Sequence, residues 1–238
     1  MRVVALKTRI FREGEILVDF IAKYVKKPRE GSILVVTSKI VALSESRAVL
    51  RVSDAHKDHI IKSESDFALK TKLAWLTIKN GVVLASAGVD ESNADGKLIL
   101  LPKDSFAAAA KLRMLLKKYW KLKKLGVLIT DSRLLPLRAG SVGVALGYAG
   151  FKGVKDYRGT KDIFGRVLKM SRVDVADSLA TAAVLEMGEG AERQPLALIE
   201  DAPVEFTERV NKKELAIDIR EDLYGPLFIA VKKLSKRR

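Results

Sequence analysis

The chain has 238 residues, of which 48% are hydrophobic, enough for one large domain or two interlocked ones. It contains no cysteine, which excludes disulfide bridges, a thiolate nucleophile and cysteine-based zinc or iron–sulfur sites. The formal net charge of +15 indicates anionic partners, such as nucleotides, polycarboxylates, nucleic acid or an acidic membrane face. Because no apolar run approaches the length of a membrane span and the start lacks a secretory pattern, we expect a cytoplasmic protein without a membrane segment.

The first third of the chain alternates strand-like and helix-like patterns. We expect a strand over Val3–Lys7 and a helix over Gly14–Tyr24, whose apolar residues fall on one stripe. Residues 32–43 predict a further strand, and the polar segment 44–65 predicts a surface region without a core of its own. The spacing of apolar residues over 67–80 predicts a helix that a glycine ends.

The remaining elements are more apolar, and they are followed by glycines or acidic residues. Asp104 is expected to cap a helix that continues to residue 124 with lysines on its outer face. The other expected elements are strands over Val82–Ala87, 98–102, 125–131, 141–150 and 195–201 and a helix over Val173–Met187 capped by Ser171. This irregular order predicts an α/β or α+β fold, and no linker divides residues 1–238, so we expect a single domain, with two interlocked subdomains as the alternative.

Basic and histidine residues give weaker indications. The lysine-rich helix 104–124 and the tail 231–238 are expected to be solvated, with an anion-docking surface as the alternative. His56 and His59 are the only histidines, and their spacing suits a shared metal ion on a helix. Because their neighbours are charged and no third ligand is near, a solvated loop is the favoured interpretation.

Two of the predicted apolar strands end in turns that are rich in oxygen ligands. Val82–Ala87 runs into a turn containing Asp90, and the strand after Leu125 ends at Asp131 and Ser132. Ligand sites often form where the strands of an α/β sheet stop, and carboxylate and hydroxyl oxygens suit Mg²⁺ or Mn²⁺ rather than zinc or copper. The two turns therefore indicate either a shared metal site or ordinary turn chemistry.

A glycine-rich loop, "MGEGAERQP" (187–195), follows the last predicted helix. Backbone N–H groups in such a loop can approach phosphates, although many loops of this kind only end a helix. The sequence on its own leaves both roles open.

Four segments together resemble, in their order and spacing, the coenzyme F420-0:gamma-glutamyl ligase family. They are "VVTSKIVALSESR", "AGVDESN", "ITDSRLLPLRAGSVGVALGYAGFKGVKDYRGTKDIFGRVL" and "VADSLATAAVLEMGEG", and the resemblance covers about residues 32–200. A short form of the family, also labelled a folate-metabolism gamma-glutamate ligase, is the most similar. The resemblance implies an α+β fold of two intertwined α/β parts, a homodimer, and a nucleotide-dependent ligase that attaches L-glutamate through its γ-linkage.

The resemblance also implies site residues. Asp90 and Asp131 match the metal-binding aspartates of the family, and Ser132 stands where a hydroxyl residue helps to hold a second metal ion. The positions that match nucleotide contacts are Ser38, Asn93 and the loop residues Met187, Gly188, Glu189, Gly190, Ala191, Glu192, Arg193 and Gln194.

Cationic side chains near these motifs are candidates for holding anionic groups. Lys39, Arg138 and Arg158 are the candidate clamps, and Lys39 is assigned to the nucleotide. Asp156 is expected to orient Arg158 at the reaction centre, with a purely structural ion pair between the two as the alternative.

The chemistry expected from these residues is amide ligation. Two Mg²⁺ or Mn²⁺ ions, with GTP or ATP as co-substrate, would support phosphoryl transfer to an anionic F420-0-like or folate-like acceptor, and the amine of glutamate would attack the resulting acyl phosphate. The alternatives are an amide ligase with a different acceptor and a non-catalytic protein that binds anions or nucleic acid on the same scaffold.

Overall fold

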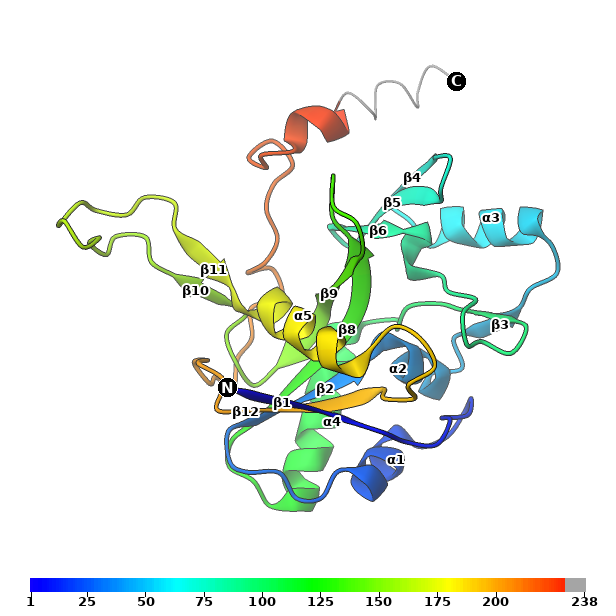
Figure 1. The fold of residues 1–238 in the computed structure, drawn as a ribbon, viewed down its shortest axis with the longest axis horizontal. Coiled ribbons are helices and arrows are strands. Elements are labelled where there is room, and N and C mark those ends of the chain that lie inside the picture. The colour runs from blue at the N-terminus through cyan, green and yellow to red at the C-terminus, as the bar shows by residue number, and fades with distance from the viewer. Residues whose placement is uncertain (230–238) are drawn as a thin grey trace.

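The computed structural model describes residues 1–229, so the basic tail 231–238 lies outside the described residues. A five-stranded sheet forms the centre of the molecule (Figure 1). Its strands, in spatial order, are β1 (Arg2–Leu6), β12 (Leu196–Glu200), β2 (Ser32–Thr37), β8 (Leu125–Leu134) and β9 (Ser141–Ala149). β2 and β8 are parallel, whereas the other neighbouring pairs are antiparallel.

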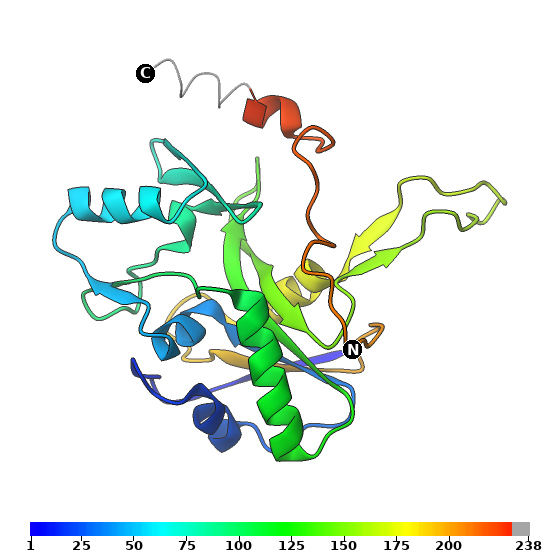
Figure 2. The ribbon, with the colours of Figure 1, turned by 180° about the vertical axis from the view of Figure 1, so that it is seen from behind.

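Helices cover both faces of this sheet, which makes a three-layered α+β body (Figure 2). One face is covered by α1 (Leu17–Tyr24), α2 (Ser38–Ser44) and α4 (Ser105–Trp120), and the other by α5 (Val175–Met187). Both faces of β2 are therefore buried, which explains its unbroken apolar run. Leu34 and Val36 pack toward the first set of helices, and Ile33 and Val35 pack toward α5.

Of the two helix caps that the sequence predicts at N-termini, one is confirmed and one is not. Asp104 accepts a hydrogen bond from the Ala107 N–H and starts α4, as the sequence predicts. α5 is capped by Asp174 and not by Ser171, because the chain up to Asp174 is still paired in a strand. The predicted strand over 32–43 is also shorter, since it ends at Thr37 and α2 begins at Ser38.

A smaller unit lies beside the main sheet, and two of its segments differ from the structure expected from the sequence. The expected helix over 67–80 is wrong: β4 (Phe67–Lys70) and β5 (Trp75–Lys79) form an antiparallel sheet with β6 (Val82–Ala85). The expectation of a segment without a core over 44–65 is wrong as well. That segment contains β3 (Ala48–Leu50), which pairs with β7 (Lys97–Ile99), and α3 (Asp54–Ser63), whose Ile61 is buried. His56 and His59 lie on α3 and not in a loop.

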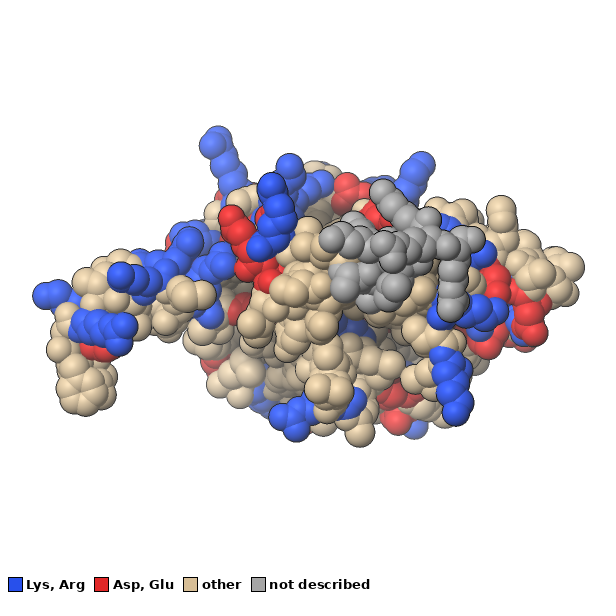
Figure 3. All heavy atoms as spheres, turned by 90° about the horizontal axis from the view of Figure 1, so that it is seen from above, with Lys and Arg blue, Asp and Glu red and all other residues tan. Residues whose placement is uncertain are grey.

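A long hairpin, here called the arm (residues 154–174), projects away from the sheet (Figure 1). Its base is the antiparallel pair β10 (Val154–Asp156) and β11 (Arg172–Asp174). Large apolar side chains are exposed along its outer part, with exposed fractions of 91% at Ile163, 89% at Phe164 and 87% at Met170. Lysine and arginine side chains also stand along the arm when the molecule is viewed from above (Figure 3).

The C-terminal segment 201–229 runs back over the body and is held by two carboxylates. Glu208 accepts hydrogen bonds from Arg113 on α4 at 2.7 and 2.8 Å, and from Lys117 at 2.9 Å. Glu214 accepts from the Tyr148 hydroxyl at 2.6 Å and from the Gly153 N–H at 2.7 Å, beside the base of the arm. Within residues 1–229, every helix is too short or too polar to cross a lipid bilayer.

Candidate functional site

The parallel pair β2–β8 brings two site residues to one edge of the sheet. Thr37 ends β2 and pairs with Thr130, the last residue of β8 that pairs with β2. β8 itself continues to Leu134 beside β9, so the expected end of this strand at Asp131 is wrong, and Asp131 lies inside β8, paired with Val144. Asp131 follows Thr130 directly, and Lys39 follows Thr37 by two residues at the start of α2. Lys39 and Asp131 therefore lie on adjacent segments, just beyond the point where the pairing of β2 with β8 stops.

The turn that carries Asp90 is held in an unusual backbone conformation. Ser86, Ala87 and Gly88 all have positive φ angles, of 51°, 56° and 71°. Left-handed backbone at non-glycine residues costs about 1 kcal/mol or more per residue and persists where the surroundings hold it in place. Here the buried Thr77 hydroxyl accepts a hydrogen bond from the Ala87 N–H at 2.7 Å and donates one to the Leu84 carbonyl at 2.7 Å.

Asp90 itself is placed by backbone pairing with Ile99. The Asp90 N–H donates to the Ile99 carbonyl at 3.0 Å, and the Ile99 N–H donates to the Asp90 carbonyl at 2.8 Å. This bridge holds the turn beside the place where β2 ends, and the Asp90 side chain reaches Lys39 there. The left-handed residues and Thr77 carry no sequence motif, so sequence analysis missed them.

Lys39 contacts the turn that carries Asp90. Its Nζ lies 2.8 Å from Asp90 Oδ2 and donates hydrogen bonds to the Ser92 carbonyl at 2.8 Å and to Ser92 Oγ at 3.3 Å. Ser92 in turn donates to Asp90 through its N–H at 2.7 Å and its hydroxyl at 2.9 Å. Burial raises the pKa of Asp90, but Lys39 and the two donors of Ser92 outweigh it and bring that pKa below its ordinary value.

Asp131 has the opposite balance. Burial raises the pKa of its carboxyl to about 7, and the nearby charges of Asp90 and Glu189 add to the rise. A hydrogen bond at 2.9 Å from the Ser132 N–H and the charge of Lys39 act against it. Asp131 is thus near enough to Asp90 and Glu189 for their negative charges to raise its pKa.

The loop 188–194 closes the other side of this edge. Asn93 Nδ2 donates to the Gly190 carbonyl at 3.3 Å, which ties the loop to the Asp90 turn. The Glu192 carboxylate folds back over the loop and accepts from the Gly190 N–H at 2.8 Å. Thr8 donates its N–H to the Arg193 carbonyl at 2.9 Å, so the loop is also tied to the chain after β1.

Several predicted contacts differ in their accessibility. Ser38 is buried at the start of α2, and Met187 is buried in the core, so its side chain is not available to a nucleotide. Glu189, Gly190, Ala191, Glu192 and Arg193 are exposed, whereas Gln194 is partly buried. Gly188 ends α5 with a φ of 78°. Lys39 contacts the Asp90 turn, and Asn93 contacts the loop at Gly190.

The three predicted catalytic residues lie elsewhere. Asp156 and Arg158 are at the start of the arm and bond to each other, with the Arg158 Nε 3.0 Å from both carboxylate oxygens. This pairing lowers the pKa of Asp156 to about 2. Arg138 is exposed in the turn between β8 and β9. Within residues 1–229, no hydrogen bond or ion pair links Arg138, Asp156 or Arg158 to Asp90 or Asp131. Asp156 and Arg158 form the ion pair that was the alternative expectation for them.

The residues present fit a hard divalent cation. Asp90, Asp131, Ser92 and Ser132 offer oxygen donors, and the ammonium of Lys39 shows that the Asp90 turn already holds a cation. Within residues 1–229, no three acidic, histidine or cysteine side chains are grouped closely enough to form a metal cage. Mg²⁺ commonly uses one or two carboxylates and completes its shell with water and substrate phosphates, so a pair of aspartates is sufficient.

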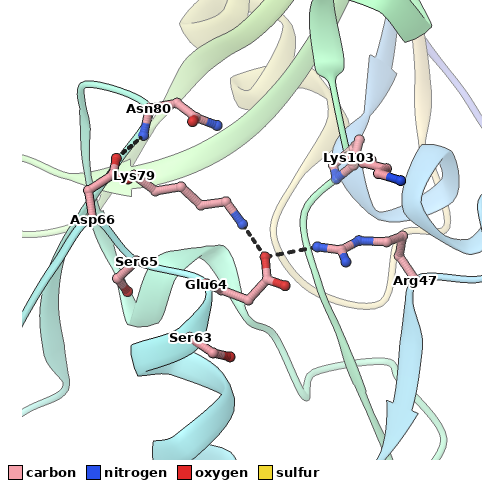
Figure 4. Close-up of a pocket in the computed structure, with 9 residues that line it drawn as sticks. Arg47, Ser63, Glu64, Ser65, Asp66, Lys79, Asn80 and Lys103 are labelled. Carbon is pink, nitrogen blue, oxygen red and sulfur yellow. Dashed lines mark hydrogen bonds and ion pairs between the residues drawn. The ribbon is translucent and has the colours of Figure 1, made fainter.

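A second hollow, of about 300 Å³, lies beside the small sheet and is distinct from this edge (Figure 4). Glu64 points into it between Arg47 and Lys79 and pairs with both, at 2.8 Å in the case of Arg47. The two cations exceed the one carboxylate by a single charge, but all three groups are already paired with one another, so the hollow offers a weaker case for ligand binding than the acidic edge does.

The chain is similar in sequence to known proteins over most of its length. The family model described as F420-0:Gamma-glutamyl ligase matches residues 5–201. A coenzyme F420:L-glutamate ligase of Methanococcus maripaludis is 32% identical over 94% of this chain and 97% of its own length. Proteins with the same name from Methanocaldococcus jannaschii and Archaeoglobus fulgidus are 33% and 31% identical, over 87% and 80% of this chain and 90% and 83% of their own lengths.

Proposed function

Because the chain belongs to the F420-0:gamma-glutamyl ligase family, we propose that it attaches L-glutamate to an acceptor carboxylate with the help of a nucleoside triphosphate and divalent metal ions. Family membership makes the chain a gamma-glutamyl ligase. The acceptor in our proposal is an anionic, F420-0-like molecule, in keeping with the names of the relatives. A folate-like acceptor remains the second possibility.

The observation that carries the proposal is the meeting of Asp90, Asp131 and Lys39 at one sheet edge, opposite the loop 188–194. Acidic oxygens on one side and backbone N–H groups on the other suit a metal–triphosphate complex. The large positive charge of the chain favours the approach of an anionic acceptor and nucleotide.

The proposed reaction begins with transfer of the terminal phosphoryl group to the acceptor carboxylate. Mg²⁺ or Mn²⁺, held by Asp90 and Asp131 with Ser132, would neutralise phosphate charge and so lower the repulsion between two anions. Lys39 and the N–H groups of the loop 188–194 bind phosphate oxygens and orient the nucleotide. The amine of glutamate then attacks the acyl phosphate, and phosphate leaves as the amide forms.

We further propose that the protein acts as a homodimer in the cytoplasm, where the nucleotides that it consumes are made. The exposed apolar side chains of the arm, Ile163, Phe164 and Met170, support this assembly, because such a set is rarely left in water unless a partner covers it. A second copy of the chain is the occupant that we propose.

A ligation assay tests the function. The full-length protein is incubated with L-glutamate, Mg²⁺ or Mn²⁺, GTP or ATP, and either F420-0 or a folate, and nucleoside diphosphate and a glutamate-sized mass increase are followed together. We expect D90N and D131N to lose at least about 99% of the ligation rate, because each removes a metal-binding charge. D95N is the matched control, since Asp95 is exposed in the same turn with a positive φ that asparagine also adopts.

Full activity in D90N and D131N would contradict the site. A protein without nucleotide turnover that instead bound arbitrary RNA, with a steep dependence on salt, would support the non-catalytic alternative.

A further inference from the structure

We propose that the ammonium group of Lys39 is a built-in substitute for the metal ion, occupying a coordination position on Asp90 that a divalent cation must take over. This inference rests on the proposed function and adds a competition within the same site. When the metal arrives, Lys39 leaves Asp90 and moves to the nucleotide phosphates. Metal and nucleotide therefore bind much better together than either does alone.

The contacts of Lys39 form a cation-binding arrangement. Its Nζ touches a carboxylate oxygen of Asp90, the backbone carbonyl of Ser92 and the hydroxyl of Ser92, with the first two at 2.8 Å. Carboxylate, carbonyl and hydroxyl oxygens are the donors that hard divalent ions use. A lysine in an ordinary surface ion pair contacts one carboxylate, whereas this one is surrounded by oxygens from a single turn.

The charges around Lys39 explain why a substitute is needed. Asp131 feels the negative charges of Asp90 and Glu189, and Lys39 is the cation that acts against them. Without a cation, the negative charges of Asp90 and Glu189 would act on Asp131 unopposed, and the Asp90 turn would lose the contacts that Lys39 makes with it. With Lys39 in place, the turn keeps its shape before the metal binds.

Lys39 is also able to leave. Its backbone is anchored at the start of α2, directly behind the paired end of β2, while the side chain is 27% exposed and ends in a flexible stem. A metal ion at Asp90 would repel an ammonium at hydrogen-bond distance from the same oxygen. The loop 188–194, where we place the phosphates, lies next to the Asp90 turn through the Asn93–Gly190 contact.

The decisive measurement is Mn²⁺ binding to the full-length protein without nucleotide, followed by the electron paramagnetic resonance signal of free Mn²⁺. We expect K39Q to bind Mn²⁺ about tenfold more tightly than the wild-type protein, because the competing cation is gone. Lys57 provides the matched control, since its Nζ pairs at 3.0 Å with Glu91, the residue next to Asp90. K57Q removes the same charge without vacating the Asp90 oxygen, and we expect it to change the affinity by less than about threefold.

A second measurement tests whether Lys39 moves away from Asp90, as opposed to a change in metal affinity caused only by the loss of a positive charge nearby. Trace acylation of lysines, quantified by mass spectrometry, reports how available each ammonium group is. We expect saturating Mg²⁺ alone to raise the labelling of Lys39 several-fold, and Mg²⁺ with a non-hydrolysable nucleotide to suppress it again. The labelling of Lys57 should stay constant. Thermal melts of both variants show whether they remain folded.

The outcomes distinguish failure of the competition between Lys39 and the metal from failure of the proposed metal-dependent function. Unchanged or weaker Mn²⁺ binding by K39Q, or equal tightening by K57Q, overturns the substitution while leaving the ligase function intact. Failure of the wild-type protein to bind Mn²⁺, both with and without nucleotide, overturns the substitution and the metal-dependent function together.

Discussion

Asp131 is a side chain whose proposed role in metal binding carries a cost in the stability of the folded protein. Burial and its acidic neighbours raise its pKa to about 7, so the folded protein holds a proton there that an unfolded chain loses near pH 4. As the pH rises through the interval from about 4 to about 7, the unfolded state releases its proton first, and the free energy of unfolding falls.

The first prediction concerns D131N, whose side chain does not ionise. We expect its melting temperature, relative to that of the wild-type protein, to rise as the pH increases from about 4 to about 7 and to level off above. Excess Mg²⁺ should remove this difference at pH 8, because the ion compensates the charge of Asp131. Thermal melts in a pH series measure both effects, and a difference that is independent of pH would contradict the prediction.

At the scale of residues, the sequence predicts ligand chemistry better than contacts. Asp90 was identifiable because an oxygen-rich turn follows an apolar strand, whereas the turn expected at Asp131 is a continuation of β8. The two carboxylates are near enough for the charge of Asp90 to raise the pKa of Asp131, and their role in metal binding stays a prediction. The pairing of Asp156 with Arg158 was expected from the sequence, but the sequence does not reveal that the pair stands at the start of the arm. The positive φ angles of Ser86 and Ala87 could not be predicted either, because they depend on the distant Thr77.

Two glycines of β9 are packed closely by neighbouring helices. A Cβ atom at Gly143 would lie 2.2 Å from the backbone oxygen of Ala180 on α5, and one at Gly147 would lie 2.4 Å from the backbone carbon of Ser105. Backbone atoms cannot move aside as a flexible side chain can. These two glycines therefore set the distance of both helices from the sheet.

The second prediction follows from this packing. We expect G143A to lower the free energy of unfolding by about 2 kcal/mol or more, because α5 must shift away from β9. Urea denaturation measures the change, and S141A serves as the control at the exposed start of the same strand. Equal stability of G143A and S141A would show that the helix adjusts without cost.

The third prediction concerns the three charges in the hollow of Figure 4. Glu64 joins the end of α3 to Arg47, which precedes β3, and to Lys79 on β5, and these pairs lower its pKa despite its burial. Because the group is still partly hydrated, we expect E64Q to lose only about 1 kcal/mol of stability, less in high salt. Urea denaturation at two salt concentrations tests this, and an equal loss at both would contradict an ionic origin.

Element prediction succeeded where one face or both faces of a segment are uniformly apolar. The central strands and α4 fall into this class. The segment 67–80 failed because its apolar residues fit a helical period as well as a strand period, and hydrogen bonding between β4 and β5 decides the matter. The arm was missed because its exposed residues have no burial pattern to follow.

At the scale of the whole molecule, the arm is the feature that a single chain does not explain. The fourth prediction is that the wild-type protein sediments as a dimer and that the double variant I163S/F164S sediments as a monomer, because it removes the apolar tip. L73S is the control, since Leu73 is also highly exposed but lies between β4 and β5. A monomeric wild-type protein would refute the proposed homodimer.

The position of β12 has a consequence for synthesis of the protein. This strand lies between β1 and β2, although it is the last to leave the ribosome and they are among the first. Until it emerges, β1 has no partner in the sheet, and the edge of β2 is an open template for pairing with other chains. We therefore expect nascent chains that end before residue 196 to remain incomplete and prone to aggregate, so that the metal site forms only after translation has nearly ended.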